Sequence, residues 1–160
     1  MKLETERFGA IELDDCKIIT FKQGLPGLEE FTEFIILELA ESKPLLWLQS
    51  TQNGLVYLPV LIPFELMPDY SVEIQDKELE ELNITSKDDL LVLNVVVVRE
   101  DITKMTANMA APIIVNTKRG IGKQIIIDAK DQPVRFPIYD VIMNMLQEGK
   151  ADAGAVSQKG

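Results

Sequence analysis

Histidine is absent from this 160-residue sequence, and cysteine occurs only once, as Cys16. The lack of both residue types removes nearly all ligand sets used for zinc, and every catalytic dyad or triad that relies on histidine. Cys16 cannot form a disulfide within the chain, which fits a reducing compartment; we interpret it as a small strand residue. The remaining chemistry is carboxylate, lysine, serine or tyrosine catalysis, or metal binding by oxygen ligands. These absences argue against an enzyme and indicate no cofactor.

Long apolar runs are also missing. No run approaches the roughly 20 residues needed to cross a bilayer, and residues 1–6 lack the apolar core of a signal peptide. With 46% hydrophobic residues the chain is long enough for one domain with a real core. We therefore expect a cytoplasmic protein without membrane contact, folded as one domain over residues 1–148. The small and polar residues 149–160 predict a disordered tail.

Short apolar and β-branched runs separated by turn signals predict a mainly β fold, a small antiparallel β-barrel or sandwich with one or two short helices. The predicted strands are Lys17–Phe21, Phe34–Leu39, Leu45–Gln49, Val56–Leu61, Leu90–Val98, Ile113–Asn116 and Ile125–Asp128. The predicted helices are Asp76–Leu82, which opens with acidic residues, and Pro137–Leu146, whose apolar residues recur at helical spacing.

Three local patterns sharpen this prediction. The run Leu90–Val98 does not alternate with polar residues, so we expect a central strand buried on both faces. Asn53-Gly54 predicts a tight hairpin turn, because both residue types tolerate a positive φ. Leu25-Pro26-Gly27-Leu28 has the type II pattern, with proline at the second position and glycine at the third. This turn either serves only the fold or shapes a rim where a partner docks.

Two motifs suggest a phosphate-binding loop and paired catalytic carboxylates, but the sequence supports neither. The stretch 117–124 contains Gly-Lys, but Thr117 stands where a P-loop needs glycine and Gln124 stands where it needs Ser or Thr, so we expect a basic hairpin loop. Neighbouring residues on a strand point to opposite faces, and on a helix they lie about 100° apart, so adjacent carboxylates do not converge on a substrate. Such pairs are Asp14-Asp15, Glu29-Glu30, Glu80-Glu81 and Asp88-Asp89. We interpret them as solvated charge.

The net charge of -10 is concentrated in one segment. Residues 65–89 carry nine acidic against two basic residues, while residues 90–160 carry seven against nine. Such an acidic segment disfavours direct nucleic-acid binding, which depends on neutralising phosphates, and favours a basic protein partner. Apolar side chains recur among the acids of 65–81, a mixture that suits a protein interface. Core packing beneath a solvated face is the alternative. The candidate acidic contacts are Glu65, Asp69, Glu73, Asp76 and Glu78.

Four segments, taken in order, resemble the FliW family of bacterial flagellar assembly factors. They are Phe21–Phe31, with its Gly-Leu-Pro-Gly turn, Trp47–Ser50, Pro59–Pro63 and Thr106–Asn116. The resemblance runs from about Phe8 to Arg135. Whether Asn108 and Asn116 face a partner or satisfy backbone groups in a turn stays open at this point.

The resemblance implies a small β-barrel-like protein without enzymatic activity that binds flagellin and the RNA-binding translational repressor CsrA. It implies that the protein prevents CsrA from silencing flagellin mRNA until free flagellin titrates it away. The alternative function is a flagellin-specific export chaperone with no translational role. Under either hypothesis the partners are proteins, with no direct contact to nucleic acid or membrane. Under the first hypothesis the candidate acidic contacts face CsrA.

Overall fold

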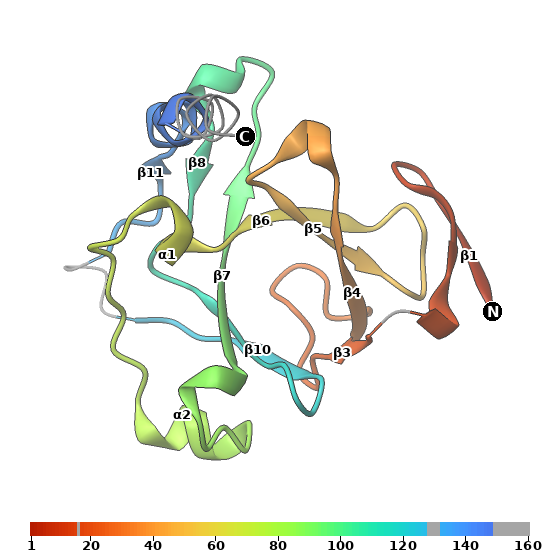
Figure 1. Cartoon of the computed structure of the whole chain (residues 1–160). Helices are drawn as coiled ribbons and strands as arrows, with labels where there is room; N and C mark the ends of the chain where they lie inside the picture. The colour runs from red at the N-terminus through yellow and green to blue at the C-terminus, as the bar shows by residue number, and fades with distance from the viewer. Residues whose placement is uncertain (16, 128–131, 149–160) are drawn as a thin grey trace, which may run out of the picture.

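Seven strands close into a barrel at the centre of this computed structural model, which describes residues 1–15, 17–127 and 132–148 (Figure 1). All strands of the described residues, including those outside the barrel, are β1 (Lys2–Thr5), β2 (Gly9–Glu12), β3 (Ile19–Thr20), β4 (Glu33–Glu38), β5 (Leu46–Ser50), β6 (Tyr57–Leu61), β7 (Leu90–Val97), β8 (Thr106–Ala107), β9 (Ile113–Asn116), β10 (Ile121–Gln124) and β11 (Phe136–Pro137). The helices are α1 (Pro63–Leu66), α2 (Asp76–Glu81) and residues 139–148, and short 3-10 turns cover Leu13–Asp15, Ala40–Ser42, Lys87–Asp89 and Ile102–Lys104.

The barrel follows the order β7-β6-β5-β4-β3-β10-β9 and closes because β9 also pairs with β7. Its neighbours are antiparallel except for β3 and β10, which run parallel and meet at Thr20 and Ile121. An odd number of strands cannot alternate in direction all the way around a ring, so one parallel pair is required. The predicted mainly β, antiparallel barrel is confirmed, with one parallel pair at the seam between β3 and β10.

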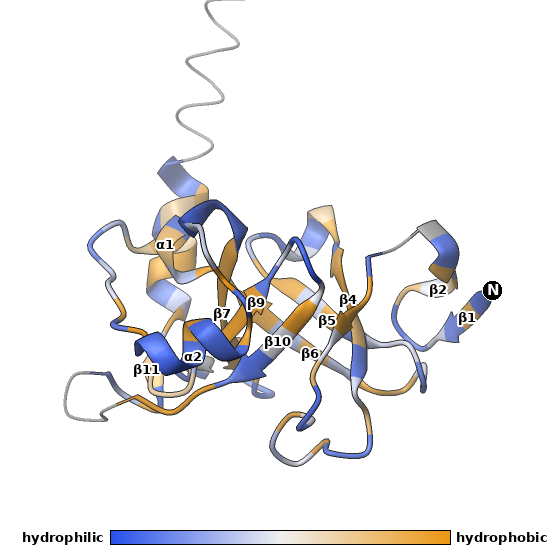
Figure 2. Ribbon diagram, turned by 90° about the horizontal axis from the view of Figure 1, so that it is seen from below, coloured by the Kyte–Doolittle hydropathy of each residue, from blue (hydrophilic) through white to orange (hydrophobic). Residues whose placement is uncertain are grey.

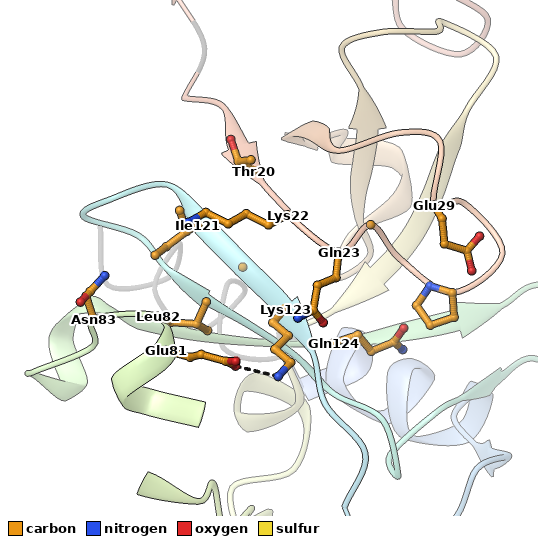
Figure 3. A pocket seen from close by; sticks show the side chains of 13 residues that line it. Thr20, Lys22, Gln23, Glu29, Glu81, Leu82, Asn83, Ile121, Lys123 and Gln124 are labelled. Atoms are coloured by element: carbon orange, nitrogen blue, oxygen red, sulfur yellow. Dashed lines mark hydrogen bonds and ion pairs between the residues drawn. The ribbon is translucent and has the colours of Figure 1, made fainter. Parts of the chain in front are cut away.

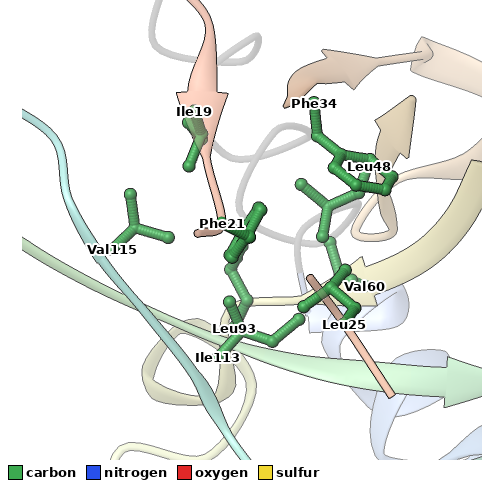
Figure 4. Close-up of a cluster of buried hydrophobic side chains, with 9 residues drawn as sticks. All are labelled: Ile19, Phe21, Leu25, Phe34, Leu48, Val60, Leu93, Ile113 and Val115. Atoms are coloured by element: carbon green, nitrogen blue, oxygen red, sulfur yellow. The ribbon is translucent and has the colours of Figure 1, made fainter. Parts of the chain in front are cut away.

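The barrel interior is filled by aliphatic and aromatic side chains (Figure 4). Its buried members are Ile19, Phe21, Leu25, Phe34, Leu48, Val60, Leu93, Ile113 and Val115. Two further clusters lie outside the ring of strands: one beneath α1 and the C-terminal helix, around Leu61 and Ile142, and one beneath α2, around Leu82 and Val92. Figure 2 shows the apolar strands at the centre of the molecule and the hydrophilic α2 beside them.

Strand β7 contributes to all three clusters, since Val92, Leu93 and Val96 each pack into a different one. The central strand buried on both faces is therefore confirmed over this stretch. Its predicted end is wrong, because Val97 and Val98 are 48% and 44% exposed and Val98 lies beyond the strand.

Several predicted boundaries need correction. The first predicted strand, Lys17–Phe21, is reduced to Ile19–Thr20, and the role of Cys16 lies outside the described residues, as does the tail 149–160. Pro137 does not begin the C-terminal helix, because it pairs with Thr106 in β11 and the helix follows from residue 139. The buried Ile138 and Ile142 still give that helix the apolar face that its spacing predicts. Helix α1 and the strands β1, β2, β8 and β11 were not predicted.

The last predicted strand, Ile125–Asp128, is also misplaced. The ladder to β9 is made instead by Ile121–Gln124, and the chain then continues extended, with Ile125 N donating to Pro112 O and Ile127 N donating to Ala110 O. Asp128 lies outside the described residues. Three of the four residues of β10 are therefore Gly122, Lys123 and Gln124, which have low strand propensity. They form a strand because they pair with β9.

The hairpin between β5 and β6 is confirmed, but its turn differs from the prediction. Residues 51–56 connect the strands, and neither Asn53 nor Gly54 has a positive φ. Gly54 is needed for space instead, since a Cβ there would lie 1.8 Å from the backbone oxygen of Glu4. The predicted turn at Leu25–Leu28 is confirmed, with Gly27 at φ 83° and Leu28 N donating to Leu25 O at 2.8 Å.

Candidate partner-binding grooves

The five candidate acidic residues lie along one side of the barrel and do not form a single cluster. Glu65 belongs to α1, Asp69 and Glu73 lie in the connecting segment, and Asp76 and Glu78 belong to α2. In Figure 1 this segment runs from α1 down to α2. All except Glu78 are exposed. The structure thus leaves four of the five accessible to a partner.

Glu73 and Glu78 also line a groove of about 620 Å³, together with one basic residue, Lys77; we call it the acidic groove. Ile125, Ile126 and Ile127 line the same groove. Ile126 is 89% exposed, the highest value among the large hydrophobic side chains of the described residues. An exposed aliphatic side chain beside carboxylates is the combination that a protein interface uses, with an apolar anchor and surrounding charge.

Helix α2, which carries two of the candidate residues, has a defined beginning and end. Asp76 and Glu78 lie in its first turn, where the helix dipole favours negative charge. Its end is a Schellman motif: Asn83 adopts φ 56°, Asn83 N donates to Glu80 O, and Ile84 N donates to Leu79 O. Asparagine tolerates this left-handed conformation better than most residues, which explains why the helix stops there.

Two side chains attach α2 to the barrel. Asn116, which is 2% exposed, donates through Nδ2 to Leu82 O and Asn83 O, while its Oδ1 accepts from the backbone N–H groups of Lys118 and Arg119. Lys123 of β10 places Nζ 2.7 Å from Glu81 Oε2 and 2.9 Å from Glu78 Oε2. Glu78 is therefore already paired within the molecule, which makes Glu73 the stronger candidate contact in the acidic groove.

The same lysine borders a second groove of about 460 Å³, the polar groove (Figure 3). Its lining includes Lys22, Gln23, Glu29, Glu81, Asn83 and Lys123. Hydrogen bonds from Glu29's own backbone N–H and that of Gly27 hold the pKa of Glu29 below its usual range. The hydrogen bond from Lys123 lowers the pKa of Glu81, and bonds to Glu78 and Glu81 raise the pKa of Lys123. These shifts make the carboxylates weaker bases and the lysine a poorer nucleophile, the opposite of what catalysis needs.

A third groove of about 490 Å³, the mouth groove, opens on the far side of the turn at Leu25–Leu28 and shares Pro26 and Gln124 with the polar groove. It exists because β6 and β7 separate. They pair only at Val60 with Val95 and Leu61 with Asn94, although the same register would bring Leu58 opposite Val97. Leu58 and Val97 line the groove instead. The turn thus forms part of a rim, and docking of a partner there stays a prediction.

Asparagines 108 and 116 both satisfy backbone groups, and Asn108 also lines the mouth groove, so for Asn108 the two interpretations do not exclude each other. Asn108 Oδ1 accepts from Ala110 N and Ala111 N, and Asn116 makes the four bonds described above. The sequence prediction missed Ile126 as a surface residue, since the run Ile125–Asp128 was assigned to a strand. The only feature of the sequence that could have indicated the exposure of Ile126 was an apolar residue next to turn residues.

Other classes of site find little support in the described parts of the chain. No helix there is long and apolar enough to cross a membrane. Within the same residues, no group of three or more carboxylates or other common ligands could hold a metal ion. The fold and its surface therefore define a class: a small closed β-barrel with charged grooves.

Comparison with known proteins identifies the family. A sequence model described as FliW protein matches residues 2–138. The flagellar assembly factor FliW of Clostridium tetani (strain Massachusetts / E88) is 37% identical over 139 residues, covering 87% of this chain and 96% of that protein. That of Alkaliphilus metalliredigens (strain QYMF) is 35% identical over 156 residues, covering 97% of this chain and 96% of that protein.

A solved structure agrees with these relatives. The crystal structure of the flagellar assembly factor FliW superimposes with a TM-score of 0.79 at 30% sequence identity, covering 87% of this chain and 97% of that one. The chain belongs to the FliW family of flagellar assembly factors.

Proposed function

We propose that this chain binds the translational repressor CsrA, prevents it from silencing flagellin mRNA, and also binds flagellin, so that the two proteins exchange on it. The proposed site of action is the cytoplasm, and the proposed role involves no catalysis. The observation that carries the CsrA part is the acidic groove, which the 89% exposed Ile126 and the exposed Glu73 both line. Of the other exposed candidate acids, Asp69 and Glu65 extend the negative surface toward α1, and Asp76 lies at the start of α2.

The two kinds of side chain in this groove have different tasks. Burying an isoleucine side chain contributes about 1.5–3 kcal/mol, whereas an exposed ion pair contributes only about 0–1 kcal/mol. Ile126 therefore supplies affinity, and the carboxylates supply attraction at a distance and selectivity for a basic partner. A repressor that binds RNA needs basic surface. An acidic protein docked beside that surface repels incoming phosphates without having to fill the RNA site.

Two substitutions separate these tasks in a binding assay with purified CsrA. We expect Ile126→Ser to weaken affinity about 10- to 100-fold with the salt dependence unchanged. We expect Glu73→Lys to slow association and to flatten the dependence of affinity on ionic strength. Glu41→Lys is the matched control, because Glu41 is exposed in the turn at Ala40–Ser42, between β4 and β5 and outside the acidic groove. Unchanged kinetics in both groove variants would remove the acidic groove from the proposed function.

The exchange mechanism is tested with both partners present. Flagellin added to the complex with CsrA is expected to displace CsrA, and a stable complex of all three proteins would contradict titration. An in vitro translation assay separates the alternative function. Added protein should restore translation of a CsrA-repressed message, whereas flagellin binding without this effect would indicate an export chaperone.

A further inference from the structure

The mouth groove has a charge opposite to that of the rest of the molecule. Arg99 and Arg135 both line it and both are exposed, and among the described lining residues none is acidic. In the described parts of the chain neither arginine makes an ion pair. In a chain of net charge -10, this groove thus has a lining whose charged side chains are both positive.

The groove is also apolar between these charges. Val97 and Val134 are 48% and 54% exposed, while Leu25, only 2% exposed, links the groove to the barrel core. Leu28 and Leu58, which pack against the same core, complete the aliphatic lining. Binding aliphatic side chains in this groove costs little free energy, because apolar side chains line it. When the groove is empty, those apolar side chains stay exposed to water.

We propose that the mouth groove binds an acidic polypeptide segment, one whose aliphatic side chains enter between β6 and β7 while its carboxylates meet Arg99 and Arg135. Arginine suits this task, since its guanidinium matches a carboxylate in geometry and stays charged. A nucleic acid would also bring negative charge, but the aliphatic lining offers nothing to a sugar-phosphate backbone, and the net charge of the chain repels it. The two grooves thus select partners of opposite charge, and this proposal does not depend on the identity of the partner at the acidic groove.

Three fluorescein-labelled synthetic peptides test this proposal by fluorescence anisotropy at low salt. They share the same leucine positions and carry Glu, Ser or Lys at the intervening positions. We expect the Glu peptide to bind about three- to tenfold more tightly than the Ser peptide, since each exposed charge pair contributes little, and the Lys peptide to bind most weakly. In the double variant Arg99→Glu and Arg135→Glu, the order of the Glu and Lys peptides should reverse.

The control is the double variant Lys87→Glu and Lys118→Glu, which changes the net charge equally. Lys87 precedes β7, and Lys118 follows Asn116, the residue that pairs with the first residue of β7. Arg99 lies beyond the last residue of that eight-residue strand, so about 20 Å separates the control lysines from Arg99. This variant should keep the order of the three peptides. A second variant, Val97→Trp, fills the groove from a half-exposed position and should weaken all three.

Methyl NMR places the bound peptide, with the signals of Leu28, Leu58 and Val97 expected to shift on addition of the Glu peptide. Equal binding of the three peptides, no binding of any, or the same loss in the lysine control would overturn the proposal. Sedimentation that shows a wild-type dimer, dissociated in the arginine variant, would also overturn it by giving the groove to a second copy of the chain.

Discussion

Asn116 connects two parts of the molecule through a single buried side chain. Its amide nitrogen satisfies two carbonyls at the end of α2, and its amide oxygen satisfies two backbone N–H groups in the turn between β9 and β10. Alanine at this position would remove all four bonds, of which the bond to Leu82 O is fully buried and the other three are partly buried. A buried polar group without a partner costs about 1–3 kcal/mol.

We therefore expect Asn116→Ala to lower the free energy of unfolding by about 2–3 kcal/mol, measured by urea denaturation. Asn53→Ala is the control, because Asn53 Oδ1 accepts only from Leu55 N, in an exposed turn. That change should stay within about 1 kcal/mol. Equal losses in the two variants would show that the bonds of Asn116 do not stabilise the attachment of α2.

Gly54 illustrates what a local pattern can and cannot predict. Its place after Asn53 correctly predicts a hairpin between β5 and β6. The reason given by the pattern is wrong, because the glycine makes room for Glu4 and its carbonyl accepts from Glu6 N at 3.1 Å. That neighbour comes from the β1–β2 hairpin, about 50 residues earlier in the chain, and no local pattern reports such an approach.

At the level of elements, Lys123 attaches α2 to β10. The bonds to Lys123 hold the pKa of Glu81 below its ordinary value of 4.5 and the pKa of Lys123 above its ordinary value of 10.5. A lowered carboxyl pKa stabilises the fold above the ordinary value, and this contribution is lost as the pH falls through the lowered pKa. A raised lysine pKa stabilises below 10.5, and its contribution is lost as the pH rises through the raised value.

We expect Lys123→Met to remove both of these pH-dependent contributions to stability while keeping the aliphatic part of the side chain. Unfolding in urea should show a smaller loss of stability for the variant than for the wild type when the pH falls from neutral to about 3. Hydrogen exchange should speed up at Leu79 of α2 and at Leu82, which follows its last residue, because this helix loses its attachment. Lys87→Met removes an exposed lysine outside this ion pair and should change neither measurement. If Lys123→Met kept the acid profile of the wild type, the pair would have no role in holding α2.

The elements that the sequence predicted well are those with strong intrinsic signals. The apolar β7, the β4–β5–β6 meander and the acid-opened α2 all appear near their predicted positions. Strand β10 was misplaced because Gly122, Lys123 and Gln124 carry no strand signal, while the adjacent isoleucines do. Tertiary pairing with β9 overrides propensity there, and the isoleucines line the acidic groove. The acidic half of that groove was predictable, but its apolar half was not.

For the molecule as a whole, composition and strand spacing predicted the barrel, but not how it closes. Closure depends on β3 meeting β10 in parallel, through one residue pair and a bond from Thr20 N to Gly120 O at 2.8 Å. These two strands lie about 100 residues apart in the chain. Because pairing between distant segments is not encoded in any local run of residues, the sequence alone could not identify this seam.

Gly122 lies in β10 at this seam and allows the last prediction. A Cβ at this position would lie 2.6 Å from Cε1 of Phe21, whose ring is fully buried and packs edge-on against Phe34. The ring has no room to withdraw in a close-packed interior. Gly122→Ala should therefore lower the free energy of unfolding by about 1–3 kcal/mol, measured by urea denaturation with the fluorescence of Trp47, the chain's one tryptophan, as the signal.

Phe21→Leu creates space at the same contact and also destabilises the barrel when made alone, because it removes buried apolar surface. If the clash lies between these two residues, the double variant Gly122→Ala with Phe21→Leu should lose less stability than the sum of the single losses, by about 1 kcal/mol. Strict additivity would mean that the added methyl group is accommodated elsewhere, and that close packing of Phe21 against Gly122 does not govern how the barrel closes.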